Sequence, residues 1–405
     1  MKVVILSETF AKNMGYMGNM LPRHLARLGA DVHMVTLDLR PYYQISDFQQ
    51  TYSDFKEAAV MPAGTVEGYD GYTLHVLPHR QLLGYMSMKG LAEKLREIRP
   101  DVVYSLAAVG WIALQAAALQ RLLGYRLFTG SHTTASVFPL AKGQHSPFEP
   151  AMLRNFVTRV VPGRFVSLAT DICYGATSDC ADVAVRFFGV EEKKMRICPL
   201  GVDTDMFYPL ETDKEMRRRL EIRAGFGFAL EEIVCMYTGR FSAEKNPAVL
   251  ARAIARLRAQ GEPFRAIFFG NGSQADEIRA TPGCVVHPFV PVHELGDYFR
   301  AADIGVWPTQ ESTSMLDAAA SGLPIVVNDT LLAVERVDGN GLKYRLNDVG
   351  NLVEVLQTLK DKSERDRLGA IGAEKMRSRF SWASIAQRRL DDFEHALRRG
   401  GARHG

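Results

Sequence analysis

The alternation of strand-like and helix-like segments constrains this chain most, because the same alternation occurs twice. Short apolar runs of strand length alternate with segments of helical period, and this pattern predicts parallel strands connected by helices. In the first half we expect strands at residues 3–6, 31–36, 101–105 and 125–129, with helices at residues 20–28 and 111–123. In the second half we expect strands at residues 233–238, 264–269, 304–307 and 325–327, with helices at residues 247–260 and 315–320.

The length of the chain fits two such sheets. A chain of 405 residues is long for one core and suggests two domains of about 200 residues each. We place the join within the segment MRICPLGVDTDMFYP, so that one doubly wound, Rossmann-like domain covers residues 1–198 and a second covers residues 199–381. The last helix, expected at about residues 382–399, is predicted to pack back on the first domain. The sequence therefore predicts an α/β protein whose two domains face a central cleft.

Composition excludes several classes of protein. The net charge of +3 is too small to indicate a nucleic-acid partner. The five cysteines lack CxxC spacing and are typical of reduced thiols in the cytoplasm. No apolar run reaches the length of about 18 residues that would predict a membrane span. The first residues, MKVVILSETF, lack the features of a signal peptide. We therefore expect a cytoplasmic protein.

Two loops of the first half carry candidate site residues, because ligands of parallel sheets bind at the carboxyl ends of the strands. Gly15 and Gly18 lie between the first strand and helix, where a ligand could approach the backbone. The loop does not match GxGxxG, which argues against a nicotinamide cofactor; an ordinary flexible loop is the alternative. His132 follows a strand among Gly, Ser and Thr. It could hydrogen-bond a substrate or, equally, be a structural histidine bonded to nearby backbone.

Two loops of the second half follow strands in the same way. Arg240 and Lys245 lie in the loop TGRFSAEKNP. Arginine supplies a planar donor fork and lysine a compact charge, so the pair suits a diphosphate. Gly270 and Gly272 flank Asn271 in the segment FFGNGS. A base or ribose could lie against this turn, although Gly-Asn-Gly is also an ordinary turn.

The segment QESTSMLDAAASGLPIVV places charges and hydroxyl groups between a strand and a helix. Glu311 and Asp317 bracket the Ser-Thr-Ser run at residues 312–314, ahead of the helix expected at residues 315–320. Amide groups at a helix start favour a phosphate or a sugar hydroxyl. A capped helix is the alternative interpretation, since Ser or Thr followed by an acid is a capping signature. Capping and binding do not exclude one another here.

The ordered set of motifs resembles that of GT-B retaining glycosyltransferases of family GT4. The matching segments are GVDTDMFYP, YTGRFSAEKNPAVLARAIARL, FGNGS, HPFVPVHELGDYFRAADIGVWPTQES, DAAASGLPIV and FSW. They cover nearly all of the second half, whereas the first half matches more loosely. The resemblance implies a GT-B fold and a hexosyltransferase-type enzyme. It would move a sugar from a UDP- or GDP-linked donor to an acceptor hydroxyl with retention, in polysaccharide, glycolipid or other glycoconjugate synthesis.

The resemblance also implies roles for individual residues. Arg240 and Lys245 would hold the donor diphosphate, Glu311 the sugar hydroxyls and Asp317 the ribose, while His132 would meet the sugar near the reacting centre. The implied catalytic residues are His132, Arg240, Lys245 and Glu311. The implied donor-binding residues are Gly15, Gly239, Gly270, Gly272, Val290, Ser312, Thr313, Ser314, Met315 and Asp317.

One motif departs from the family pattern. The family usually has two glutamates separated by seven residues, with Gly-Phe-Gly-like residues after the first. Here five residues separate Glu311 from Asp317, the second acid is Asp, and Ser-Thr-Ser replaces the glycines. The position eight residues before Asp317 is Thr309, which is not an acid. We expect the shorter loop to alter which sugar fits.

A second motif raises the question of a metal. Asp203 and Asp205 spell DxD, a metal-binding signature of a different glycosyltransferase fold. They lie in the join between the domains, away from the strand ends. The resemblance implies that basic residues and amides neutralise the diphosphate instead. We therefore expect no metal and no cofactor.

The acceptor is expected on the first domain. Residues 40–85 are rich in Tyr, Met, Phe and Leu, which could contact a lipid-linked acceptor at a membrane or pack in a core. We expect a carbohydrate, lipid-linked or small-molecule acceptor, and a cytoplasmic protein with a peripheral contact at the inner face of the plasma membrane as one option. A sugar-nucleotide epimerase and a catalytically inactive nucleotide-sugar-binding protein remain as alternatives.

Overall fold

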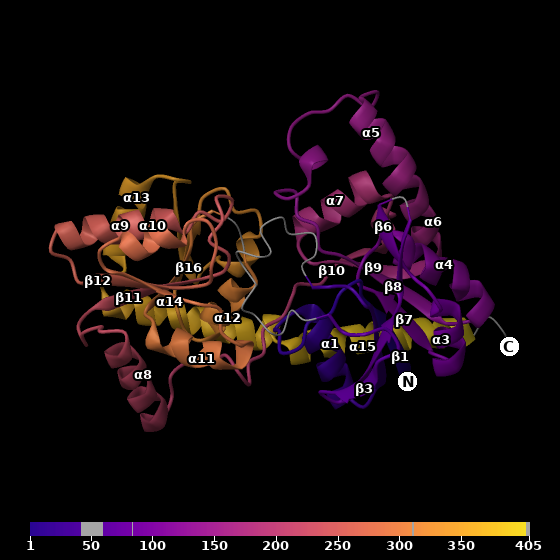
Figure 1. The fold of residues 1–405 in the computed structure, drawn as a ribbon, viewed down its shortest axis with the longest axis horizontal. Helices are drawn as coiled ribbons and strands as arrows, with labels where there is room; N and C mark the ends of the chain where they lie inside the picture. Colours follow the sequence, from indigo (N-terminus) through magenta and orange to yellow (C-terminus); the bar gives the residue numbers. More distant parts are fainter. Residues whose placement is uncertain (42–59, 83, 310–311, 402–405) are drawn as a thin grey trace.

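The computed structural model describes residues 1–41, 60–82, 84–309 and 312–401. These residues form two lobes, each built around a mostly parallel sheet with helices on its faces (Figure 1). The first sheet has eight strands in the order β10-β9-β8-β7-β1-β2-β4-β3, and the second has six in the order β13-β12-β11-β14-β15-β16. In each sheet the chain adds strands first on one side of a central strand and then on the other, as in doubly wound folds.

The first lobe contains the strands of the larger sheet and a separate hairpin. Its strands are β1 (Lys2–Leu6), β2 (Asp31–Leu37), β3 (Val66–Tyr69), β4 (Tyr72–Leu77), β7 (Val102–Ser105), β8 (Arg126–Ser131), β9 (Thr170–Gly175) and β10 (Met195–Ile197), and the hairpin pairs β5 (His79–Leu82) with β6 (Tyr85–Met88). Its helices are α1 (Met17–Arg27), α3 (Leu91–Ile98), α4 (Trp111–Leu123), α5 (Pro150–Asn155), the π-helix η3 (Phe156–Val160), α6 (Val161–Ala169) and α7 (Ser178–Phe188), with the 3₁₀ turns η2 (Pro139–Ala141) and η4 (Glu192–Lys194).

The second lobe contains the smaller sheet. Its strands are β11 (Ile233–Thr238), β12 (Phe264–Phe269), β13 (Cys284–His287), β14 (Ile304–Trp307), β15 (Ile325–Asn328) and β16 (Gly341–Tyr344). Its helices are α8 (Asp213–Gly225), α9 (Ala248–Ala259), α10 (Ala275–Ala280), α11 (Val292–Ala301), α12 (Ser314–Ala320), α13 (Val349–Thr358) and α14 (Lys362–Lys375), with the 3₁₀ turn η5 (Val334–Arg336) and the π-helix η6 (Met376–Phe380).

The strands expected from the sequence are confirmed to within two residues, because continuous apolar runs are buried on both faces of a parallel sheet. All six residues of β11, for example, are buried. The helix expected at residues 20–28 instead begins at Met17. Gly18 and Asn19, which are typical of loops, lie in its first turn, where Met17 and Met20 are buried. The predicted boundary at residue 198 falls between the last strand of the first sheet and the first strand of the second.

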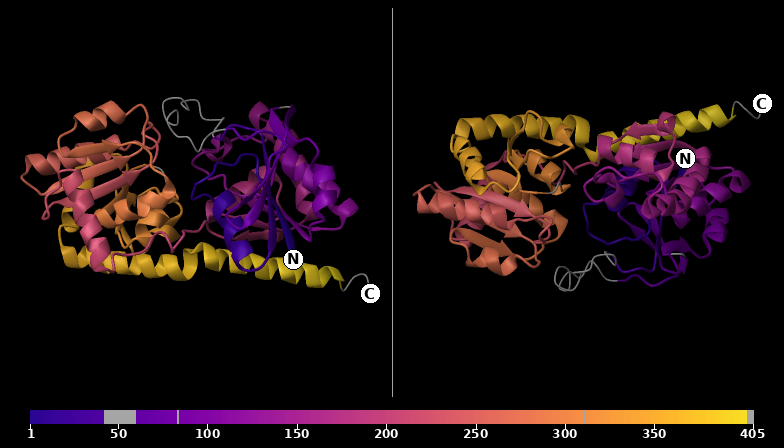
Figure 2. Two further views of the ribbon diagram at one scale, coloured as in Figure 1. Left: turned by 60° about the horizontal axis from the view of Figure 1, so that its bottom comes forward. Right: turned by 90° about the horizontal axis from the view of Figure 1, so that it is seen from above.

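The last helix, α15 (Trp382–Gly401), returns from the second lobe to the first. With α14 and η6 it forms a long helical stretch beneath both lobes (Figure 2). Its apolar residues join the same core cluster as Val3, Ile5 and Leu25; they are Trp382, Ile385, Ala386, Leu390, Phe393 and Ala396. At the crossing, Trp382 N donates to the carbonyl of Val202 at 3.0 Å. The first lobe is therefore completed by the end of the chain.

Candidate functional site

A cavity of about 360 Å³ lies between the two lobes. It is lined by the loop after β1 in the first lobe and by segments that follow β11, β13 and β14 in the second. The lining residues are Met14, Gly15, Tyr16, Thr238, Gly239, Arg240, Lys245, Phe269, Phe289, Val290, Val292, Leu295, Ser312, Thr313, Ser314 and Asp317. Strand ends of both sheets thus contribute to one space, as the parallel topology predicts.

The two cations lie on a turn that is fixed by the backbone. Tyr237 Oη donates to the carbonyl of Arg240 at 2.9 Å, and Lys245 N donates to the carbonyl of Ser242 at 3.1 Å. Arg240 and Lys245 are both half-buried and both line the cavity. Two positive charges beside one cavity make its surface suitable for a diphosphate.

The glycine turn after β12 lies behind this loop. Gly270 has φ +151°, and a Cβ there would lie 1.9 Å from the carbonyl oxygen of Gly239. Phe241 N also donates to the carbonyl of Asn271 at 2.9 Å. Glycine is required because two backbones touch. Gly270 and Gly272 do not themselves line the cavity, so their contact with a base or ribose stays a prediction.

The Ser-Thr-Ser run reaches the cavity just before α12. Thr313 precedes the helix and makes no capping hydrogen bond through its side chain. Ser312 Oγ instead lies 2.8 Å from Ser314 Oγ. Ser312 Oγ also accepts from Ser314 N, at the start of α12, at 3.4 Å, so the run both lines the cavity and bonds the helix start. Met315 is buried beneath them, and its Sδ accepts from Ser312 N at 3.4 Å. Glu311 lies outside the described residues.

Asp317 is half-buried at the same wall of the cavity. Burial, together with the charge of Asp203, raises the pKa of Asp317 to about 8. A carboxyl group in this state can donate or accept a hydrogen bond near neutral pH. It is suited to a ligand hydroxyl, which can do the same.

The loop of Gly15 touches the opposite lobe. A Cβ at Gly15 would lie 3.0 Å from Val292 Cγ2. Val290 and Val292 line the same part of the cavity. A larger side chain at position 15 would press the lobes apart, so the glycine allows a narrow space between them.

His132 follows β8 directly and lies at the carboxyl edge of the first sheet. Both ring nitrogens are buried, and neither has a hydrogen-bond partner among the described residues. The contacts therefore do not support a histidine bonded to nearby backbone. Burial, and then the charge of Arg389, lower the pKa of His132 to about 4. The imidazole is neutral at physiological pH, and its nitrogens are unsatisfied within the described structure.

The DxD carboxylates pair with arginines of α1. Asp203 Oδ2 lies 3.3 Å from Arg23 Nη1, and Asp205 Oδ2 lies 3.0 Å from Arg27 Nη1. The two acids thus tie the segment between the lobes to the first lobe. In the described ranges, no cluster of three or more His, Cys, Asp and Glu side chains is placed to hold a metal.

Sequence reasoning missed several cavity residues. Thr238 and Phe269 are the last residues of β11 and β12, so a strict strand-end rule would have found them. Tyr16, Phe289 and Leu295 carry no comparable signal. Arg389, which lies near His132, comes from the last helix and could not be placed without the fold. None of the helices within the described ranges is long and apolar enough to cross a bilayer.

Comparison with known proteins extends over both lobes. Two family models match, Glycosyltransferase Family 4 over residues 20–206 and Glycosyl transferases group 1 over residues 232–362. The D-inositol 3-phosphate glycosyltransferase of Xylanimonas cellulosilytica is 28% identical over 415 aligned residues, covering 95% of this chain and 91% of the relative. Its namesake from Stackebrandtia nassauensis is 30% identical over 325 residues, covering 74% and 69%. The structure of Anabaena Alr3699/HepE in complex with UDP has a TM-score of 0.69 at 14% identity, covering 98% of this chain and 100% of that one.

The region that matches Glycosyl transferases group 1 contains the cavity-lining segments of the second lobe, and the resemblance inferred from the motifs is confirmed. The likeness to HepE shows the fold, which is GT-B. The chain therefore belongs to glycosyltransferase family 4, the group 1 glycosyl transferases, and is an enzyme that transfers a sugar.

Proposed function

We propose that the cavity between the lobes binds a nucleotide-sugar donor, UDP- or GDP-linked, and that its sugar passes with retention to an acceptor hydroxyl. The observation that carries this is the meeting of Arg240, Lys245 and Asp317 from one lobe with the Gly15 loop of the other around one cavity. HepE, which shares the fold, was solved in complex with UDP, and this supports a nucleotide ligand.

The chemistry follows from the charges. As the bond between sugar and diphosphate breaks, negative charge grows on the leaving oxygen, and fixed cations lower the barrier to that departure. Arg240 and Lys245 supply this charge in the proposal. Asp317 accepts from the ribose, the residues at 312–314 contact the sugar and phosphate, and Glu311 holds the sugar hydroxyls. His132 meets the sugar from the first lobe, where the acceptor is positioned on the same face as the departing group.

The proposed reaction needs no metal and no cofactor. A screen of nucleotide sugars by thermal shift identifies the donor, since a ligand that binds only the folded state raises the melting temperature. Turnover with that donor should survive EDTA, and the product should keep the anomeric configuration of the donor. If EDTA abolishes turnover and magnesium or manganese restores it, the metal-free proposal is wrong. An inverted product contradicts retention.

The same assay separates the alternatives. A sugar-nucleotide epimerase converts its donor without an acceptor, whereas a transferase requires one. An inactive binding protein shows a thermal shift and no turnover. Neither alternative is favoured by the family assignment. Because the relatives are named for D-inositol 3-phosphate, this compound is the first small-molecule acceptor to test, beside carbohydrate and lipid-linked acceptors.

We further propose a cytoplasmic location with peripheral contact at the inner face of the plasma membrane. Residues 42–59 of the stretch first considered for this contact lie outside the described residues. Support comes instead from the helical surface of residues 148–168, which is rich in exposed apolar side chains: Phe148, Leu153, Phe156, Val157, Val161, Phe165 and Leu168. Leu153 is 59% exposed, Leu168 is 64% exposed and Phe148, before the first turn, is 91% exposed.

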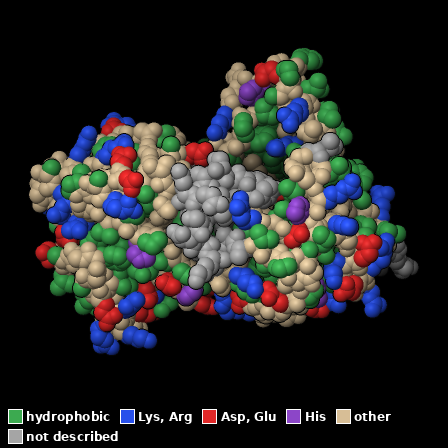
Figure 3. All heavy atoms as spheres, in the orientation of Figure 1, with side chains coloured by type: hydrophobic (Ala, Val, Ile, Leu, Met, Phe, Trp, Pro, Cys, Tyr) green, Lys and Arg blue, Asp and Glu red, His purple; other side chains and the backbone are tan. Residues whose placement is uncertain are grey.

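The shape and charge of this surface favour a lipid bilayer. It projects from the first lobe at α5, where hydrophobic side chains are visible in Figure 3. Residues 150–170 contain three arginines and no acid. An apolar face flanked by arginines is typical of helices that lie in the surface of anionic membranes.

Vesicle co-sedimentation tests this contact. The wild-type protein should sediment with vesicles that contain phosphatidylglycerol and less with pure phosphatidylcholine. Leu153→Asp with Val157→Asp should abolish the binding, whereas Leu230→Asp, at a site 74% exposed on the second lobe, should not. If the double variant instead breaks a dimer and neither protein binds vesicles, the surface joins two copies of the chain and the membrane proposal fails.

A further inference from the structure

A fully buried arginine lies behind His132. Arg389, on α15, is 0% exposed, and its guanidinium carbon lies 4.9 Å from the ring centroid of Tyr104 and 4.4 Å from that of Tyr174. Its Nη2 donates to Met17 Sδ at 3.8 Å. Within the described part of the chain, Nε and Nη1 have no hydrogen-bond partner, and no carboxylate forms an ion pair with the guanidinium.

This arrangement is unfavourable for stability alone. A buried charge without a counter-charge loses its hydration, and cation–π contacts recover only part of that loss. An acid is available nearby, because Asp392 lies one turn further along α15. Asp392 instead accepts from Tyr174 Oη at 3.0 Å and pairs with Arg196. A buried charge left without a counter-charge is a candidate for function.

Tyr104 lies against Arg389 and near His132. A Cβ on Gly130 would lie 2.7 Å from Tyr104 Oη and 2.9 Å from His132 Nε2. Glycine at position 130 therefore leaves the space that the phenol oxygen and the imidazole occupy. Tyr104 lies on β7 and His132 follows β8, so the pair stands at the carboxyl edge of the first sheet.

The surroundings of this group contain few other charges. Tyr174 and Cys173 face it from β9, Cys198 from the segment after β10, and Asp392 from α15. Among the described residues, Arg389 is the charged group that acts on His132, and its positive charge adds to burial in lowering the imidazole pKa. The cation therefore favours the uncharged imidazole.

We propose that Arg389 is a positioning residue of the sugar transfer, which holds Tyr104 and His132 in the arrangement that meets the donor sugar. The inference rests on the proposed role of His132. It gives the last helix a part in the reaction as well as in the core. Arg389 touches neither donor nor acceptor in this proposal and acts through the two side chains in front of it.

The substitution Arg389→Met tests the proposal, because it keeps much of the side-chain volume and removes the charge. Turnover should fall at least tenfold, while the Kd for the nucleotide diphosphate stays unchanged because the cations proposed to hold it, Arg240 and Lys245, lie in the other lobe. The melting temperature should stay the same or rise, since an unpaired buried charge is removed. Arg388→Met is the matched control. Arg388 is exposed and donates to the carbonyl of Arg379, and its loss should leave turnover at the wild-type level.

Titration of the His132 imidazole by NMR provides a readout that needs no substrate. The pKa of His132 should rise in Arg389→Met and stay unchanged in Arg388→Met. If no donor and acceptor give transfer with the wild-type protein, the proposed function fails, while this titration still judges Arg389. An unchanged His132 titration overturns the inference, because Arg389 would then not act through His132. A lower melting temperature with normal turnover per folded molecule overturns it as well and makes Arg389 a structural residue.

Discussion

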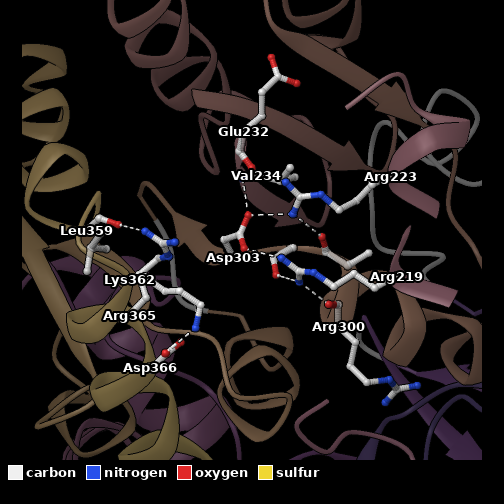
Figure 4. A network of polar contacts seen from close by, with 12 residues as sticks. Arg219, Arg223, Glu232, Val234, Arg300, Asp303, Leu359, Lys362, Arg365 and Asp366 are labelled. Carbon is white, nitrogen blue, oxygen red and sulfur yellow. Dashed lines mark hydrogen bonds and ion pairs between the residues drawn. The ribbon is translucent and has the colours of Figure 1, made fainter. Parts of the chain in front are cut away.

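Two buried arginines of this enzyme have opposite surroundings. Arg223, in the second lobe, is 2% exposed and donates to Asp303 Oδ2 at 3.0 Å. Asp303 also accepts from Arg219 at 2.5 Å and from the amide of Val234 at 2.7 Å (Figure 4). Arg389, in the first lobe, has no carboxylate partner among the described residues.

The difference separates two uses of a buried charge. The Asp303 network lies at the amino end of β14, away from the cavity between the lobes. Burial opposes the ionisation of Asp303, yet Arg219 and Arg223 lower its pKa. The buried charges of the Asp303 network therefore compensate one another. The buried charge of Arg389 has no such partner and can act on the imidazole of His132. We therefore expect the loss of a charge in the Asp303 network to lower the free energy of unfolding, and the loss of the Arg389 charge to lower turnover.

Removing the carboxylate partner of Arg223 should give the largest loss of unfolding free energy. Asp303→Asn leaves Arg223 buried without a counter-charge, which costs about 3–5 kcal/mol of unfolding free energy. Urea denaturation measures the loss. Asp366→Asn is the control, since Asp366 pairs with Lys362 on the surface and should cost at most about 1 kcal/mol. Equal losses in the two variants would show that the buried Asp303 network contributes no more to stability than a surface ion pair.

The cations at the cavity should show the reverse pattern, with little effect on stability. Lys245→Ala should reduce turnover about 10²-fold, or about 2.7 kcal/mol, because charge stabilisation of the leaving diphosphate is lost. Arg240→Ala should behave alike. Lys343→Ala, on an exposed position of β16, is the control in steady-state assays. Wild-type rates in both cavity variants would remove the diphosphate assignment.

Asp317 is an acid whose charge is opposed by burial, as the charge of Arg389 is. Asp317→Asn should weaken nucleotide binding by about 1–3 kcal/mol, because the hydrogen bond between the carboxyl group and the ribose is lost. Calorimetric titration with the nucleotide diphosphate measures this. Unchanged affinity would mean that Asp317 does not contact the nucleotide.

The pKa of Asp317 also predicts a pH dependence. The unfolded carboxyl ionises near 3.8, whereas the folded one keeps its proton to about pH 8. Folding free energy is therefore lost as pH rises from about 4 to about 8. Asp317→Asn should flatten this decline when unfolding is measured across that range. A decline of the same size in the variant assigns it to other groups.

The smallest change in stability should appear below about pH 6.5, where two buried histidines can be compared. Burial lowers the pKa of both His75 and His132 to about 4, against 6.5 for the free side chain. Each should cost stability as pH falls from about 6.5 to about 4, on the order of 1 kcal/mol by pH 5.5. Arg389→Met should reduce the loss of stability that comes from His132 and leave that from His75 unchanged. After burial, it is the charge of His33 that lowers the pKa of His75. NMR titration of both imidazoles separates the two; equal shifts would deny a local effect of Arg389.

Much of the second lobe could be predicted from sequence, because its motifs are local. Arg240 and Lys245 lie on one short loop and share a turn, so spacing alone places them together. Asp317 and the hydroxyl run are likewise fixed by one helix start. The strands could be found because each is a continuous buried run. The fold and the family were therefore accessible from the order of residues alone.

The site on the first lobe could not be predicted in the same way. His132, Tyr104 and Arg389 are brought together by neighbouring strands and by a helix from the far end of the chain. No spacing rule joins such positions. Helical spacing from Ile385 and Phe393 places Arg389 on the apolar face of its helix, but the sequence does not show which strands that face meets. The contact between α15 and the strands of the first lobe can be recognised only once the topology is known.

The crossing of the chain at Val202 and Trp382 has a consequence for biosynthesis. During translation the second lobe is complete once residue 380 has left the ribosome, whereas the first lobe still lacks the helix that supplies Trp382, Leu390 and Phe393 to its core. Domains synthesised first usually fold first. Here the order is inverted, and the nascent first lobe must keep its apolar underside apart from other chains until the final helix emerges. A ribosome that stalls before the final helix has emerged would leave a folded second lobe joined to a first lobe that is not folded.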